Sequence, residues 1–145
     1  MLALFERDQP QHVSRGDAIC SALQIINFLQ DVAVDWGKGR VYLPQQDLQQ
    51  FDLTEQQIAR AEVDARWRAL MAFEVERARA MMRSGATLAL DMPGRFGWEL
   101  RLIVLGGLRV LEKIEAVGFD VFRQRPTVNK RDWLELGWRA LRFVV

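Results

Sequence analysis

The chain has 145 residues, and half of them are hydrophobic, which suits one domain with a sizeable core. Its 20 basic and 19 acidic residues leave a net charge of +1, so no bulk electrostatic field draws it to nucleic acid. One cysteine and one histidine exclude an internal disulfide, a cysteine-built zinc site and a histidine metal cluster.

Apolar residues recur at helical spacing along the chain, and no β-alternation of useful length interrupts them. After a polar segment that contains Pro10, Ser14 or Asp17 is expected to cap a first helix. This helix is predicted to end near Trp36, where two glycines break the pattern. Residues 40–44 are predicted to be extended or loop-like, because residues before a proline avoid the helical region.

The middle of the chain predicts both short and long helices. Residues 45–50 are expected to form one or two helical turns. Thr54 and Gln57 have the spacing of a capping box that opens another short helix. Long helices are predicted over residues 63–83 and 95–117, and the apolar centre of the second should be buried on every side.

The last helix is predicted over residues 132–144, with polar and apolar stripes. We expect it to pack back onto the core; the alternative is that it lies on a membrane surface. The fold class is therefore all-α, a helical bundle of about five helices in a single domain over residues 1–145.

A polar stripe runs along the first predicted helix. Its members recur at steps of three or four residues, which places them on one face of a helix that turns every 3.6 residues. They are Cys20, Gln24, Asn27, Asp31 and Asp35, followed by the cationic and hydroxyl residues Lys38, Arg40 and Tyr42. A polar stripe on an otherwise apolar helix indicates either a wet surface or the wall of a polar cavity.

The run QIINFLQDVAVDWGKGRVYLP, from Gln24 to Pro44, resembles the second aspartate-rich motif of the squalene/phytoene synthase family. These proteins are head-to-head isoprenyl diphosphate synthases. Gln30 departs from the family pattern, since many members carry arginine there. With its neighbours it favours the hydroxysqualene synthase branch of bacterial hopanoid biosynthesis. The resemblance implies an isoprenoid synthase fold, in which two aspartate-rich motifs face each other across a cavity.

The resemblance also implies roles for the residues of the motif. Asp31, Asp35 and Asn27 would bind Mg²⁺, which keeps several waters and completes its shell with diphosphate oxygens. The metal would draw charge from the departing diphosphate as a Lewis acid. Asp31, Asp35 and Tyr42 are the expected catalytic residues, and Gln24, Asn27, Lys38 and Arg40 are expected to bind the diphosphate. The alternatives are a solvated face for the two aspartates and a packing role for Tyr42.

The likeness covers only the second half of such an enzyme, and the 145 residues contain one aspartate-rich motif. We therefore expect a C-terminal portion that is inactive alone and covers its apolar surface as a homo-oligomer or a helix-swapped dimer. The parent enzyme would convert presqualene diphosphate to hydroxysqualene. Condensation of two prenyl diphosphates, such as farnesyl diphosphate, to squalene or phytoene is the nearest alternative. A non-catalytic helical module that binds a partner is the alternative from another class.

No stretch of the sequence has the length of a membrane span. The longest apolar run, residues 102–108, lies between two arginines and is far shorter than the roughly 20 residues that a span requires. The first residues lack the basic segment of a secretory signal. We expect a cytoplasmic location, with contact to the surface of the inner membrane as the alternative.

Overall fold

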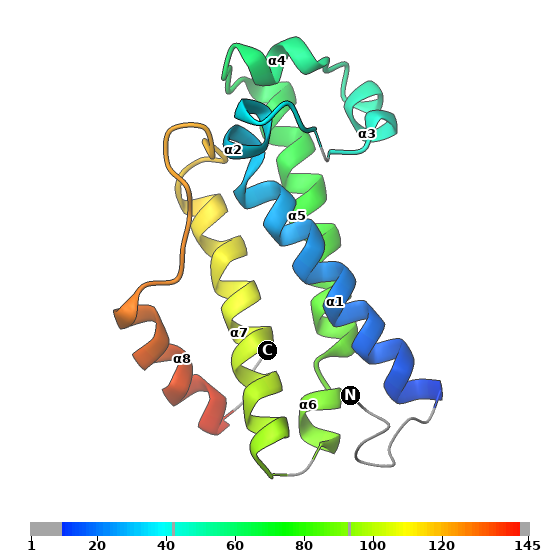
Figure 1. The fold of residues 1–145 in the computed structure, drawn as a ribbon, viewed down its shortest axis with the longest axis vertical. Coiled ribbons are helices and arrows are strands. Elements are labelled where there is room, and N and C mark those ends of the chain that lie inside the picture. Colours follow the sequence, from blue (N-terminus) through cyan, green and yellow to red (C-terminus); the bar gives the residue numbers. More distant parts are fainter. Residues whose placement is uncertain (1–9, 42, 93, 143–145) are drawn as a thin grey trace.

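The computed structural model describes residues 10–41, 43–92 and 94–142, which form eight helices and no strand. The three longest helices are α1 (Pro10–Gln30), α5 (Ala65–Gly85) and α7 (Gly94–Ala116). They pack against one another around the main hydrophobic core, and the shorter helices cap or flank them (Figure 1). The predicted all-α fold class is confirmed.

The first helix differs from its prediction at both ends. Ser14 and Asp17 lie inside α1, so neither residue caps it. Pro10 stands at the first position of α1, where its missing N–H and restricted φ suit the start of a helix. The other end comes at Gln30, because Asp31 has a φ of −107° and a ψ of 15°, outside the helical range.

The interruption at Asp31 is a kink and not a separation. The backbone N–H of Asp31 still donates to the carbonyl of Asn27 at 3.0 Å, and that of Asp35 donates to the carbonyl of Asp31 at 2.7 Å. The chain therefore continues directly into α2 (Val32–Gly37). The first aspartate of the motif, Asp31, stands at this change of direction, and the second, Asp35, lies one turn later in α2.

The prediction of the short helices is correct in position but not in every detail. α3 (Gln45–Gln50) is confirmed, and α4 (Glu55–Ala59) begins after Thr54. The capping box is wrong, because the Thr54 side chain makes no capping bond. The Gln57 side chain is buried and donates instead to the carbonyl of Glu62 at 2.9 Å. α6 (Leu88–Asp91) was not predicted, since four residues are too few to show a period.

The long helices cross closely at glycines. A Cβ atom on Gly85 would lie 2.4 Å from the backbone oxygen of Arg15, and one on Gly107 would lie 2.7 Å from Cε of Met82. α1, α5 and α7 can thus approach more closely than larger residues would permit. The centre of α7 is less buried than predicted, because Ile103 is 41% exposed.

The segment after α7 passes near α2 and then runs back along α7 to the start of α8 (Figure 1). It leaves the helix through Gly118 and Phe119, whose φ angles are both 64°. The indole N–H of buried Trp67 donates to the carbonyl of Phe119 at 3.0 Å, and its ring packs on Phe122 with centroids 4.9 Å apart. These contacts attach the segment to α5 and set the course of the residues that follow.

The last helix, α8 (Lys130–Arg142), packs on α7. Leu136 and Ala140 are fully buried there and form a small second cluster with Leu105. Packing onto the core is therefore confirmed for this side of α8. In the described part of the chain, no helix has the length and hydropathy needed to cross a membrane.

Candidate functional site

The polar stripe lies on the outer face of α1. Cys20, Gln24 and Asn27 are exposed, whereas Asp31 and Asp35 are half-buried. The opposite face of the helix carries apolar residues that pack into the core, namely Ile19, Ala22, Ile26 and Leu29. Within the described residues the stripe therefore forms a surface, which deepens only toward the two aspartates.

The turn after α2 folds back onto Asp35. The carbonyl oxygen of Asp35 accepts hydrogen bonds from the backbone N–H groups of Lys38, at 3.0 Å, and Arg40, at 2.8 Å. Gly39 between them has a φ of +74°, a left-handed conformation that glycine adopts without strain. The turn places Arg40 beside Asp35, and both residues line the same small cavity. The side chains of Lys38 and Arg40 are exposed.

This cavity has a volume of about 10 Å³, enough for no more than one water. The rest of its wall is mostly apolar and comes from α1, α2, α4 and the turn: Phe28, Val32, Val41, Leu43 and Ile58. A prenyl chain does not fit inside it. A substrate at this site would have to lie over the open stripe.

Arg125, in the segment after α7, contacts the first aspartate of the motif. Its Nε donates to Oδ1 of Asp31 at 2.6 Å. The Gln30 side chain next to that aspartate donates to the carbonyl of Pro126. Two neighbouring residues of the motif thus hold two neighbouring residues of the segment. The sequence analysis missed Arg125, because no local pattern connects it with a motif 94 positions away.

The two aspartates suit magnesium as a pair. Oδ1 of Asp31 is bonded to Arg125, while the Asp35 carboxylate makes no hydrogen bond or ion pair with another described residue. Among the described residues no group of three or more His, Cys, Asp or Glu side chains could enclose a metal. Mg²⁺ commonly takes one or two carboxylates and obtains its other ligands from water and phosphate. The residues present therefore fit a magnesium ion that a diphosphate helps to hold.

The structure describes one of the two remaining predicted site residues, Asn27, but not the other, Tyr42. Asn27, the third predicted metal ligand, lies one turn before Asp31 and its side chain is exposed. Tyr42, the third predicted catalytic residue, lies outside the described residues. Its role stays a prediction.

A second acidic pair lies away from the stripe, between α3 and α5. Glu74 is 2% exposed and faces Asp47, and Arg77 Nη1 lies 3.3 Å from Oδ2 of Asp47 and 3.9 Å from Oε2 of Glu74. Burial, followed by the hydrogen bond and charge of Asp47, raises the pKa of Glu74 to about 8. Arg77 opposes this shift.

Comparison with protein families finds a match that covers the motif and most of the fold. The model of squalene/phytoene synthase matches residues 1–132. The 15-cis-phytoene synthase of Synechocystis sp. is 36% identical over 126 residues, and the phytoene synthase of Arthrospira platensis is 34% identical over 137 residues.

A solved structure is similar as well. The squalene synthase HpnC from Alicyclobacillus acidocaldarius superposes with a TM-score of 0.77 at 35% identity, over 81% of this chain and 45% of that one. The alignments with the two phytoene synthases cover 83% and 91% of this chain, but only 37% and 44% of those proteins. The chain thus spans less than half the length of these relatives.

Proposed function

Because the chain belongs to the squalene/phytoene synthase family, we propose that it supplies one half of a prenyl diphosphate site, built on the second aspartate-rich motif. The observation that carries the proposal is the meeting of opposite charges at the kink between α1 and α2. Two carboxylates, Asp31 and Asp35, lie there with Arg125 bonded to the first and Arg40 beside the second.

Each group has a role that its chemistry allows. Asp31 and Asp35 would hold Mg²⁺ by one oxygen or more each, with Asn27 on the same face to bind a water or a phosphate oxygen. Magnesium, when bound, would supply Lewis-acid stabilisation of the leaving diphosphate. Lys38 and Arg40 are exposed and can reach phosphate oxygens, arginine through two parallel bonds.

Arg125 is the residue that this proposal adds to the motif. Its guanidinium has further N–H donors beyond the Nε bonded to Asp31, and half of the side chain is exposed. It can therefore hold the carboxylate in place and present a donor to a phosphate at the same time. Gln24, one turn before Asn27 on the exposed stripe, can donate to the same diphosphate.

For the whole enzyme we propose the conversion of presqualene diphosphate to hydroxysqualene. In that reaction the C–O bond to the diphosphate breaks, the carbocation rearranges and water is captured. Condensation of two molecules of a prenyl diphosphate is the second candidate, favoured by the phytoene synthases among the relatives. In both cases this chain's residues bind and orient the diphosphate.

The test is calorimetric titration of the purified chain with a farnesyl diphosphate analogue whose C–O bond cannot ionise, with and without Mg²⁺. We expect binding that requires magnesium and is weakened at least about tenfold by Asp31→Asn or Asp35→Asn. Asp17→Asn is the matched control, since Asp17 is an exposed aspartate on α1, about 20 Å along the helix axis from Asp31. It should bind as the unchanged chain does.

The proposal would be contradicted by binding that does not require magnesium, or by binding that neither substitution weakens. The chain would then be better described as a helical module that acts through protein contacts. Sedimentation of the same samples tests that reading, together with the predicted homo-oligomer or helix-swapped dimer.

A further inference from the structure

The last helix has an apolar face about twice as wide as its contact with the bundle. At 100° per residue, the arc of α8 from Leu136 through Trp133 and Leu141 to Trp138 spans roughly 200°. The first part of this arc, around Leu136 and Ala140, is buried against α7. A helix that needed only to pack on α7 would require a narrower apolar face.

The uncovered part of the arc carries large side chains. Trp133 is 48% exposed, Leu134 79%, Trp138 62% and Leu141 64%. Four large apolar side chains at this exposure share one side of a single helix, unlike the isolated apolar residues of an ordinary protein surface. We call these four residues the outer face of α8.

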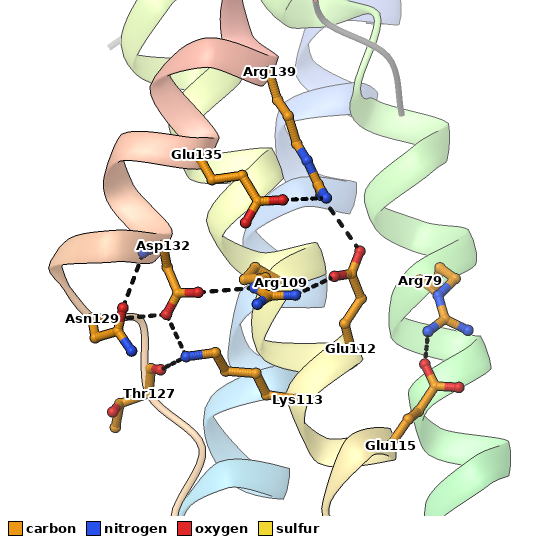
Figure 2. A network of polar contacts seen from close by, with 10 residues as sticks. All are labelled: Arg79, Arg109, Glu112, Lys113, Glu115, Thr127, Asn129, Asp132, Glu135 and Arg139. Atoms are coloured by element: carbon orange, nitrogen blue, oxygen red, sulfur yellow. Dashed lines mark hydrogen bonds and ion pairs between the residues drawn. The ribbon is translucent and has the colours of Figure 1, made fainter.

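α8 is held firmly on α7: the ring of Trp133 also lies over Gly106 of α7, 3.6 Å from where a Cβ would stand, while Leu134, Trp138 and Leu141 stay largely exposed. Asn129 and Asp132 form a reciprocal cap at its start: Asn129 N–H donates to Oδ2 of Asp132 at 2.9 Å, and Asp132 N–H donates to Oδ1 of Asn129 at 3.0 Å. Asp132 also accepts from Arg109 Nε at 3.0 Å and from Lys113. Figure 2 shows these bonds between α7 and α8.

The acidic side chains of α8 are all engaged on the bundle side or within the helix. Asp132 pairs with Arg109 and Lys113 of α7. Glu135 pairs with Arg139 at 2.6 Å, and Arg139 also approaches Glu112 of α7 (Figure 2).

The remaining charges of α8 are positive. Lys130 and Arg131 form no ion pair with a described residue, and the Arg142 guanidinium lies 5.7 Å from the ring centroid of Trp138. At 100° per residue, Lys130 lies within the arc at the start of α8, and Arg131 and Arg142 flank the arc beside Trp138.

Most of α8 lies outside the part of the chain that the family model matches. The family model ends at residue 132, so nearly all of α8 lies beyond it. α8 lies along α7, which separates it from α1 and α5 in Figure 1, and the polar stripe is on α1. The outer face and the polar stripe therefore belong to different helices, which α7 separates.

We propose that the outer face of α8 docks on an anionic lipid surface. Trp133, Leu134, Trp138 and Leu141 enter the boundary between headgroups and acyl chains, where amphipathic helices with tryptophan and leucine bury their apolar side. Lys130, Arg131 and Arg142 bind the lipid phosphates. This inference does not depend on diphosphate binding.

The test is co-sedimentation of the purified chain with vesicles of phosphatidylcholine alone, or with about one third phosphatidylglycerol. We expect binding to the anionic vesicles that weakens as salt rises. Removing the charges of Lys130 and Arg131 by substitution with glutamine should lower the partition coefficient about fivefold for each charge. Arg83→Gln removes an exposed cation from the end of α5 and should leave binding unchanged.

The apolar contribution is tested by Leu134→Glu, which should lower the partition coefficient at least about tenfold. Leu90→Glu is the control, because Leu90 on α6 is also exposed, at 56%, and lies outside the outer face. Neither leucine is part of the core, so both variants should keep the helical circular dichroism of the unchanged chain.

Three results would overturn the proposal. The first is equal binding of Leu134→Glu and the unchanged chain, and the second is equal, salt-independent binding to neutral and anionic vesicles. The third is no vesicle binding, with a dimer in ultracentrifugation that Leu134→Glu dissociates. That last result would assign the outer face to a second copy of the chain.

Discussion

Arg125 Nε donates to Oδ1 of Asp31 at 2.6 Å and so joins the segment after α7 to the aspartate motif. The guanidinium holds a carboxylate that the motif offers to a metal, and half of the arginine side chain remains open to solvent. Oδ1 of Asp31 therefore has a positive partner, and 28% of the Asp31 side chain remains exposed. The role of Arg125 in diphosphate binding can therefore be tested by substitution, like that of the motif residues.

Arg125→Gln should weaken binding of the non-reactive diphosphate by about tenfold to a hundredfold, the usual effect of losing a charged hydrogen bond. Binding of magnesium alone should not weaken, since Asp31 loses a competitor and keeps its charge. Calorimetry measures both. Arg123→Gln is the matched control: Arg123 is an exposed arginine of the same segment that pairs with Asp120. Equal diphosphate binding by Arg125→Gln and the unchanged chain would reduce Arg125 to a structural contact.

Glu74 should make stability depend on pH. Its pKa is raised from 4.5 to about 8 in the folded chain, so between these values the folded state holds a proton that the unfolded state has lost. The contribution of Glu74 to stability should be largest below about pH 4.5 and fall as pH rises to about 8, by at most about 1.4 kcal/mol per pH unit. Urea unfolding at several pH values measures this slope, which Glu74→Gln should remove. Glu76→Gln, at an exposed position two residues away, should retain it.

Gly85 should tolerate no larger residue. A Cβ there meets the Arg15 carbonyl oxygen at 2.4 Å and Cγ1 of Ile19 at 2.7 Å, and the backbone oxygen cannot rotate away. Gly85→Ala should therefore destabilise the fold by about 1–3 kcal/mol in urea unfolding.

A Cβ on Gly137 in α8 would meet nothing within 4 Å. Gly137→Ala should stabilise by up to about 1 kcal/mol, because alanine is the better helix former. Similar effects of both substitutions would contradict the close crossing of α1 and α5.

Asp132 should hold α8 to α7. The hydrogen bond from Lys113, then the one from the Asn129 backbone, and then Arg109 lower the pKa of Asp132. Its contribution should be present above about pH 4 and fade as pH falls through the lowered value. Asp132→Asn should speed hydrogen exchange of the α8 amides about tenfold or more, without a similar effect in α5. Glu135→Gln, which breaks only an exposed pair on the same helix, should have little effect. Equal exchange in both variants would show that apolar packing alone retains α8.

Helical periodicity in the sequence was sufficient for the fold class and for the long helices α5 and α7. These features depend on residues a few positions apart, and such residues meet on one face of a helix whatever the rest of the chain does. The aspartate motif was recognisable by its resemblance to a family motif, since its members follow one another in a single stretch of the chain, from Gln24 to Pro44.

The tertiary structure decided what the motif contacts. The bond between Asp31 and Arg125 joins residues 94 positions apart. The Glu74–Asp47 pair joins two helices, and no local sequence pattern predicts that these two residues meet. The packing of α8 decided which half of its apolar arc stays open. Spacing along the chain reports the faces of each helix; only the packing of helices determines which face is covered and which charges meet across it.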